Sequence, residues 1–201
     1  MKNLIVILSI APFLYFSPTL NAQDSANVLE EIPFDYASRN PIYDFSEKHL
    51  SNTDTIPDFE TMENKLKITG TVYLKDGITP AKDVILYINQ ANENGEYDLK
   101  FENDKRYVYH RAWIKTNVDG VYTFYTFIPG SYRHTRELRQ IHPMVKEAGK
   151  PEYALNTLIF EDDPFLTKAC RKKLNKKGIN NILTTLKKED MYVTNYNIIL
   201  K

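Results

Sequence analysis

Residues 66–74 read Leu66-Lys67-Ile68-Thr69-Gly70-Thr71-Val72-Tyr73-Leu74, and this stretch decides the fold class. Apolar and polar residues alternate along it, as expected for a β-strand with one buried face. The run 121–128 is dense in aromatic and β-branched residues, and it follows an Asn-Val-Asp-Gly turn at 117–120. It predicts a second strand of the same kind.

Candidate strands continue outward from these two. The further ones are residues 84–88, 107–115, 142–145, 157–160 and 192–200. Short strands separated by turn signals are typical of a sandwich or barrel, so we predict an all-β, two-layer β-sandwich. One short basic helix is expected at 168–177, ending at Gly178. Its lysines favour a solvated face, and an anionic contact patch is the alternative.

The amino terminus predicts a secretory signal peptide over residues 1–22. Lys2 precedes an apolar run, Pro12 interrupts that run, and Ala22 provides a small residue at the cleavage point. The alternative is a membrane anchor, but the apolar stretch is shorter than the ~20 residues of an ordinary span. We therefore expect a secreted or periplasmic protein with no membrane span.

The remaining chain divides in two by composition. Residues 23–64 are rich in Asp, Glu, Ser, Asn and Pro, and predict an irregular, extended arm. Their aromatic clusters favour an arm that docks on the domain, and a disordered leader is the alternative. The sandwich domain is predicted over 65–201. Such an arm is often found in dimers, so a homodimer is one expectation.

Composition excludes several classes of function. The 201 residues include 26 Lys+Arg and 26 Asp+Glu, and this balance argues against nucleic-acid binding. Cys170 is the single cysteine, so no intrachain disulfide forms, and we interpret it as an incidental thiol. The sequence has no glycine-rich phosphate loop, no Gly-x-Ser-x-Gly elbow and no His-x-x-x-His zinc pair.

Tyrosines and histidines at the ends of predicted strands form the candidate site. Tyr97 follows the strand at 84–88, Tyr132 follows the strand at 121–128, and His142 lies ten residues further on. Gln140 and His142 are two apart on a strand, so they face the same side. Phenolate and imidazole donors suit a hard, high-valent iron ion. On these residues alone, core or corner tyrosines and a structural histidine are the more common explanation.

An ordered series of motifs extends through about half of the chain. The motifs are Lys67-Ile68-Thr69-Gly70-Thr71-Val72-Tyr73, the segment 76–87, Asn94-Gly95-Glu96-Tyr97, the segments 111–117 and 119–124, Pro129-Gly130-Ser131-Tyr132, Arg139-Gln140-Ile141-His142 and Phe160-Glu161-Asp162-Asp163-Pro164. In this order they resemble the catalytic domain of the intradiol ring-cleavage dioxygenases, the non-haem ferric enzymes of the protocatechuate and catechol dioxygenase type. Residues 53–58 are similar to the lead-in of secreted members.

The resemblance implies a ferric ion, Fe3+, held by two tyrosines and two histidines. By motif the tyrosines are Tyr97 and Tyr132, and the second histidine is His142. Gln140 stands where the first histidine is expected, and a neutral amide is a poorer donor than imidazole. Two further departures are Glu137 in place of an arginine and Thr157 in place of a glutamine on the following strand.

The implied activity is cleavage of a catecholic ring between its hydroxyls with O2. Tyr132 and Arg139 are the candidate catalytic residues: a tyrosinate accepts a catechol proton, and an arginine stabilises charge on the ring. The alternative function is a catalytically degenerate or prealbumin-like β-sandwich that binds a partner. His134 is a further candidate to replace the missing ligand, and His49 and His110 are interpreted as structural or surface residues.

Overall fold

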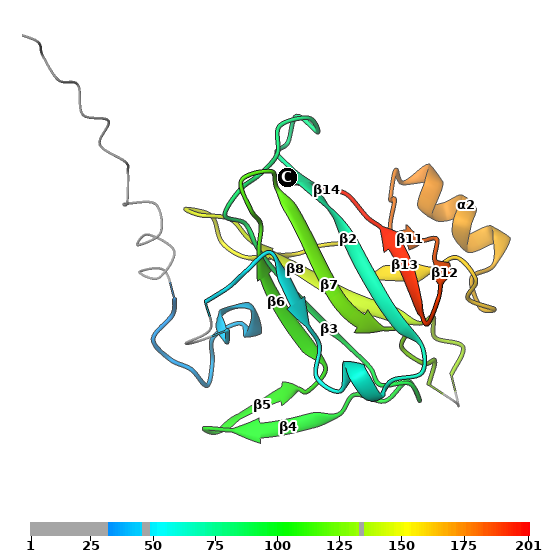
Figure 1. Cartoon of the computed structure of the whole chain (residues 1–201), viewed down its shortest axis with the longest axis horizontal. Coiled ribbons are helices and arrows are strands. Elements are labelled where there is room, and N and C mark those ends of the chain that lie inside the picture. Colours follow the sequence, from blue (N-terminus) through cyan, green and yellow to red (C-terminus); the bar gives the residue numbers. More distant parts are fainter. Residues whose placement is uncertain (1–31, 46–48, 133–134) are drawn as a thin grey trace, which may run out of the picture. The chain divides into compact units, whose positions relative to one another are not determined.

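The computed structural model describes residues 32–45, 49–132 and 135–201 (Figure 1). The predicted signal peptide at 1–22, the first part of the predicted arm, and His134 lie outside the described residues. No helix in the described part of the chain is long and apolar enough to cross a bilayer.

Two open β-sheets form the body of the described chain (Figure 1). The first sheet has the order β1 (Thr53–Thr55), β7 (Val121–Phe127), β2 (Lys65–Tyr73), β13 (Met191–Asn195), β12 (Leu186–Lys188), with β14 (Ile198–Ile199) also paired to β2. The second has the order β11 (Ile182–Leu183), β10 (Leu158–Phe160), β8 (Gln140–Lys146), β3 (Ile85–Gln90), β6 (Arg111–Lys115), with β9 (Tyr153–Ala154) paired to β8. A separate hairpin pairs β4 (Leu99–Glu102) with β5 (Lys105–Val108).

The apolar core lies between the two sheets, which confirms the predicted β-sandwich. Strand β2 is buried at every second residue, and Leu66, Ile68 and Val72 pack against residues of the second sheet such as Leu86 and Ile114. The alternation in the sequence is therefore the pattern of one face turned inward. Each fully buried side chain of this size contributes roughly 1.5–3 kcal/mol of hydrophobic free energy.

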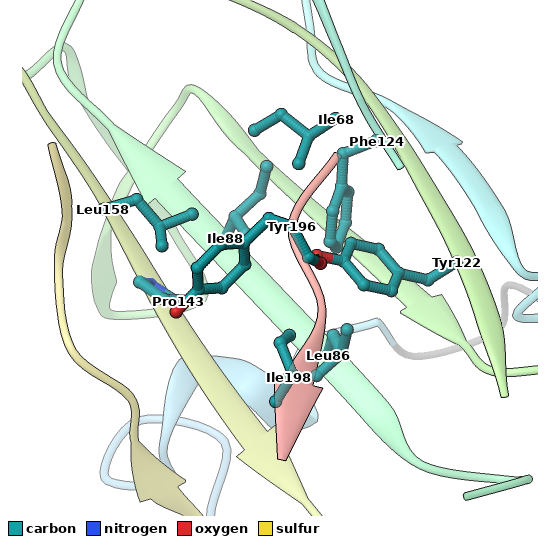
Figure 2. A pocket seen from close by; sticks show the side chains of 9 residues that line it. All are labelled: Ile68, Leu86, Ile88, Tyr122, Phe124, Pro143, Leu158, Tyr196 and Ile198. Atoms are coloured by element: carbon teal, nitrogen blue, oxygen red, sulfur yellow. The ribbon is translucent and has the colours of Figure 1, made fainter. Parts of the chain in front are cut away.

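The core contains one small apolar gap (Figure 2). Its volume is only about 10 Å3, which is at the lower limit for a single water molecule. At its edge the Tyr122 hydroxyl donates to the backbone oxygen of Tyr196 at 2.6 Å, which satisfies a buried polar group. The gap is thus a feature of core packing and too small to hold a ligand.

The predicted strands at 66–74, 84–88, 121–128, 142–145 and 157–160 are confirmed, with shifts of one or two residues at their ends. The predicted strand at 107–115 is divided, because β5 pairs with β4 whereas β6 pairs with β3. The predicted strand at 192–200 is also divided, into β13 and β14. There the backbone of Tyr196 lies against Gly70, where any Cβ would be only 2.0 Å from the Tyr196 oxygen.

The described part of the predicted arm packs on the sandwich. Strand β1 joins the first sheet in parallel with β7, and a 3-10 helix, η1 (Pro41–Tyr43), buries Ile42 completely. Asp44, directly after η1, is buried and forms ion pairs with Lys105 at 2.8 Å and Arg39 at 2.9 Å. A second 3-10 helix, η2 (Phe59–Thr61), precedes β2.

The short helix α2 (Lys168–Lys176) confirms the prediction for 168–177. The side chain of Thr167 accepts a hydrogen bond from the backbone of Cys170 and caps the first turn. Gly178 follows the helix with φ of +65°, a conformation that glycine adopts without steric cost. The helix lies at the surface, and no residue of it is fully buried.

Candidate functional site

The candidate site lies where two strands end and a third begins. Strand β3 ends at Gln90, β7 ends at Phe127 and β8 begins at Gln140. The loops that follow β3 and β7 meet around a hollow of about 30 Å3. The hollow is lined by Ala91, Gly95, Tyr97, Gly130, Tyr132, Glu137, Leu138 and Gln140. This volume accommodates a single ion or water molecule, and it is too small for an aromatic ring.

Asn92 organises the loop that carries Tyr97. Its side-chain oxygen accepts hydrogen bonds from the backbone of Asn94 and Glu96, and its amide donates to Asp98. Its backbone oxygen accepts from both Gly95 and Gly130, at 3.0 and 2.9 Å. One residue thus fixes the loop of Tyr97 and ties it to the loop of Tyr132.

The two loops approach so closely that only glycine fits at their contact. A Cβ on Gly95 would lie 2.3 Å from the backbone nitrogen of Tyr132, and one on Gly130 would lie 2.1 Å from the backbone oxygen of Glu93. Gly95 also has φ of +81°, which residues with a side chain rarely adopt. The glycines therefore allow the two tyrosines to share one hollow.

His142 on β8 joins the site through Tyr97. The hydroxyl of Tyr97 lies 2.7 Å from Nε2 of His142, although the two residues are 45 positions apart in the sequence. On the other side of the ring, Oγ1 of Thr157 lies 3.4 Å from Nδ1. We infer that the phenol donates to Nε2, so that the imidazole proton is on Nδ1 and faces Thr157. This tautomer directs the Nε2 lone pair toward the tyrosine.

Burial sets the protonation of both groups. It lowers the pKa of His142 below its ordinary value, because a charged imidazolium loses hydration there. It also raises the pKa of Tyr97, and the negative charge of Glu137 adds to this effect. In the protein alone the pair is therefore a neutral imidazole and a neutral phenol at pH 7.

Of the other predicted site residues, Tyr132 and Gln140 lie at the hollow, and Arg139 does not line it. Gln140 and Tyr132 line the hollow with Tyr97, and Tyr132 is 42% exposed. Arg139 is not among the lining residues. Its guanidinium contacts Asp162 at 2.8 Å and Asp163 at 3.3 Å, and it lies over the ring of Phe160. These contacts anchor the start of β8, and a role of Arg139 in catalysis stays a prediction.

Three further residues contribute to the site, although they were not proposed as site residues from the sequence. Asn92 orders the loop, Thr157 contacts His142, and Glu137 lines the hollow. The Asn-x-x-Gly spacing of Asn92 and Gly95 was the available signal for the loop, because asparagine often accepts hydrogen bonds from backbone groups two residues on. For Glu137 and Thr157 the signal was the motif resemblance, in which they stand in place of an arginine and a glutamine, but nothing local in the sequence indicates that Glu137 faces the hollow.

These residues fit a hard metal ion by the chemistry of their donors. Two ligands of one ion with bonds of roughly 2.1 Å lie about 3 Å apart, which is close to the separation of the Tyr97 oxygen and His142 Nε2. Among the described residues, no group of three or more His, Cys, Asp or Glu side chains is arranged to hold a metal. A metal at this site therefore depends on the tyrosines.

Comparisons with known proteins define the fold. No family model matches the sequence, and no curated protein matches it. Similar solved structures include the dioxygenase domain of a dioxygenase–carbohydrate-binding fusion from Streptomyces sp. SirexAA-E, with 21% identity and a TM-score of 0.55 over 70% of this chain and 82% of that one. An intradiol ring-cleavage dioxygenase from Tetranychus urticae has 17% identity and a TM-score of 0.54 over 76% and 87%.

A bacterial enzyme extends the same comparison. The structure of 3-chlorocatechol 1,2-dioxygenase from Rhodococcus opacus 1CP has 21% identity and a TM-score of 0.55, over 72% of this chain and 63% of that one. This chain therefore spans somewhat less than two thirds of that enzyme. The resemblance predicted from the sequence motifs is confirmed at the level of the fold: the chain has the β-sandwich of the intradiol ring-cleavage dioxygenases.

Proposed function

We propose that the chain is a secreted intradiol-type dioxygenase that uses a non-haem ferric ion to cleave a catecholic ring with O2. One observation carries this proposal. Tyr97 and His142 meet at 2.7 Å beside a hollow that Tyr132 and Gln140 also line, in a fold shared with intradiol dioxygenases. A plain binding module has no need to bring a phenol, an imidazole and a second phenol together at a gap of ionic size.

Tyr97, Tyr132 and His142 would hold the ion, and Gln140 or water would complete its surroundings. Ferric iron bound there would act as a Lewis acid toward both oxygens of the catechol. The neutral imidazole of His142 offers Nε2, and Thr157 holds its ring orientation through Nδ1. Tyr132 is the candidate proton acceptor, and its side chain lines the hollow and is 42% exposed.

The size of the hollow constrains where the substrate binds. At about 30 Å3 the hollow would hold only the ion, so a catecholic ring would lie outside it, against the exposed faces of Tyr97 and Tyr132. Both tyrosines are more than 40% exposed, which leaves aromatic surface for stacking with a ring.

Ferric reconstitution of the mature protein tests the metal site. The wild type is expected to bind about one iron and to show the visible charge-transfer colour of iron tyrosinates. Tyr97→Phe and His142→Ala should each weaken ferric binding at least tenfold, by analogy with the ~10–100-fold effects of perturbed metal sites. Tyr73→Phe, on β2 and outside the hollow, is the matched control and should bind as the wild type does.

Oxygen uptake in the presence of catechol, with a muconate-type diacid as product, then tests ring cleavage. A colourless protein that takes up no iron would contradict the proposal. The predicted export is tested separately, by determining the amino-terminal residue of the protein recovered from outside the cytoplasm; Gln23 is expected.

A second candidate is a catalytically degenerate sandwich that binds a partner. Gln140 in place of an imidazole donor favours it, because the site then has one strong ligand fewer. Iron binding without oxygen uptake across a set of catechols would support this function over ring cleavage.

A further inference from the structure

The candidate site has a deficit of strong donors. Tyr97, Tyr132 and His142 provide three, whereas Gln140 offers a neutral amide oxygen. A ferric ion is small and highly charged, and such hard cations prefer anionic oxygen ligands. A carboxylate close to the hollow would therefore bind the ion better than Gln140 does.

We propose that Glu137 supplies this carboxylate and is the fourth protein ligand of the ferric site. The proposal rests on the proposed function, because it assumes that the ion is bound at the hollow. Glu137 lines the hollow together with Tyr97, Tyr132 and Gln140. It belongs to the same loop as Tyr132, three residues before β8, so its side chain can adjust without moving a strand.

The surroundings of Glu137 leave its charge available. Arg139 lies two residues away, but its guanidinium is engaged by Asp162 and Asp163. In the described part of the chain Glu137 forms no ion pair. Glu137 is exposed, so its carboxylate is accessible from solvent.

The charge of Glu137 suits a trivalent cation bound at the hollow, which Glu137 lines together with Tyr97 and Tyr132. Two phenolates and one carboxylate carry three negative charges, and these would balance the charge of a ferric ion.

Ferric binding to Glu137→Gln tests the proposal, because the substitution removes the charge and keeps the size of the side chain. The purified mature protein is titrated with ferric nitrilotriacetate, and the visible band and the iron content are recorded. We expect the affinity to fall at least tenfold, within the ~10–100-fold range of altered metal sites, and the band to shift. Glu102→Gln, an exposed acid on β4, is the matched control and should leave both unchanged.

A second variant shows whether the loss is specific. Glu137→Gln combined with Gln140→His restores a fourth strong donor and should recover most of the ferric affinity. Thermal unfolding of the iron-free Glu137→Gln protein should match that of the wild type, since the residue is exposed. A loss of affinity with an unchanged fold and recovery in the double variant supports the proposal.

The other outcomes would contradict either the role of Glu137 or the proposed function. If Glu137→Gln binds iron as the wild type does, while Gln140→Ala weakens binding, then Gln140 is the fourth ligand and the proposal for Glu137 is wrong, although the proposed function stands. If the wild type itself binds no ferric ion, the proposed function and this inference are both wrong.

Discussion

Gln90 and Thr126 are joined by a hydrogen bond at a place where both side chains are completely buried. Oγ1 of Thr126 donates to Oε1 of Gln90 at 2.6 Å, and Nε2 of Gln90 donates to the backbone oxygen of Phe127 at 2.9 Å. Gln90 ends β3 in one sheet and Phe127 ends β7 in the other. These bonds therefore connect the two sheets directly below the loops that carry Tyr97 and Tyr132.

Thr126→Val should destabilise the protein, because it keeps the shape of the side chain and leaves Oε1 of Gln90 without its donor. Leaving a buried polar group unsatisfied costs about 1–3 kcal/mol. Urea unfolding monitored by tryptophan fluorescence measures the free energy of unfolding. Thr55→Val, on the exposed face of β1, is the control and should change it by less than about 0.5 kcal/mol. Equal effects of the two substitutions would contradict the role of the buried bond.

Gly95→Ala should disrupt the site more than backbone strain alone explains. The new Cβ would meet the backbone of Tyr132 at 2.3 Å, so the two loops must separate. Gly149→Ala is a matched control, because Gly149 also has a positive φ, +69°, but has no atom within 4 Å of the added Cβ. Both substitutions carry the cost of the backbone conformation, roughly 1 kcal/mol.

The comparison of these two glycine variants separates the effect of backbone strain from that of the steric clash with the backbone of Tyr132. We expect Gly95→Ala to lose ferric binding and Gly149→Ala to keep it. Retention of binding by Gly95→Ala would show that Tyr97 and Tyr132 need no close loop contact to act together.

His110 should make the protein less stable as the pH falls below about 6.5. Burial lowers the pKa of its imidazole from the ordinary value of 6.5 and outweighs the opposing charges of Asp98 and Asp58, whose carboxylates lie 3.6 and 3.8 Å away. The unfolded chain then takes up a proton at a pH where the folded protein does not. Stability is therefore fully present above 6.5 and declines as the pH falls toward the folded pKa.

Urea midpoints at pH 7.5 and 5.5 test this for the wild type and His110→Gln. The substitution should reduce the difference between the two midpoints. The difference that remains arises from other titrating groups such as His142. An NMR titration in which the His110 ring shows a pKa above 6.5 would mean that the two carboxylates outweigh burial.

The extent to which the sequence predicts this structure differs between fold and site. Alternation in β2 is local information, since each inward residue is apolar regardless of its partner, so Leu66 and Ile68 identify the strand and its buried face. The break at Tyr109 and His110 is not local. It arises because β5 and β6 find different partners, and nothing within 107–115 specifies those partners.

The site depends on register, which the sequence does not encode locally. His142 lies opposite Asn89 because β8 and β3 pair in one alignment, and a shift of one residue would turn its ring to the other face. The motifs of Tyr97 and Tyr132 predict loops, but their convergence depends on contacts of Gly95 and Gly130 with backbone far along the chain. Residue identity thus predicted the candidate ligands, and only the fold shows how they meet.

Gln140→His should raise the ferric affinity of the wild-type protein at least tenfold, because it adds an imidazole to the same face of β8 as His142. Met144→His is the control, since Met144 also shares that face but lies two residues beyond His142, away from the hollow. Ferric titration measured by the visible band compares the three proteins. A rise in Gln140→His alone indicates that the hollow has the geometry of a metal site and accepts an imidazole at position 140 in addition to Glu137, whereas no rise would show that the geometry itself is lost.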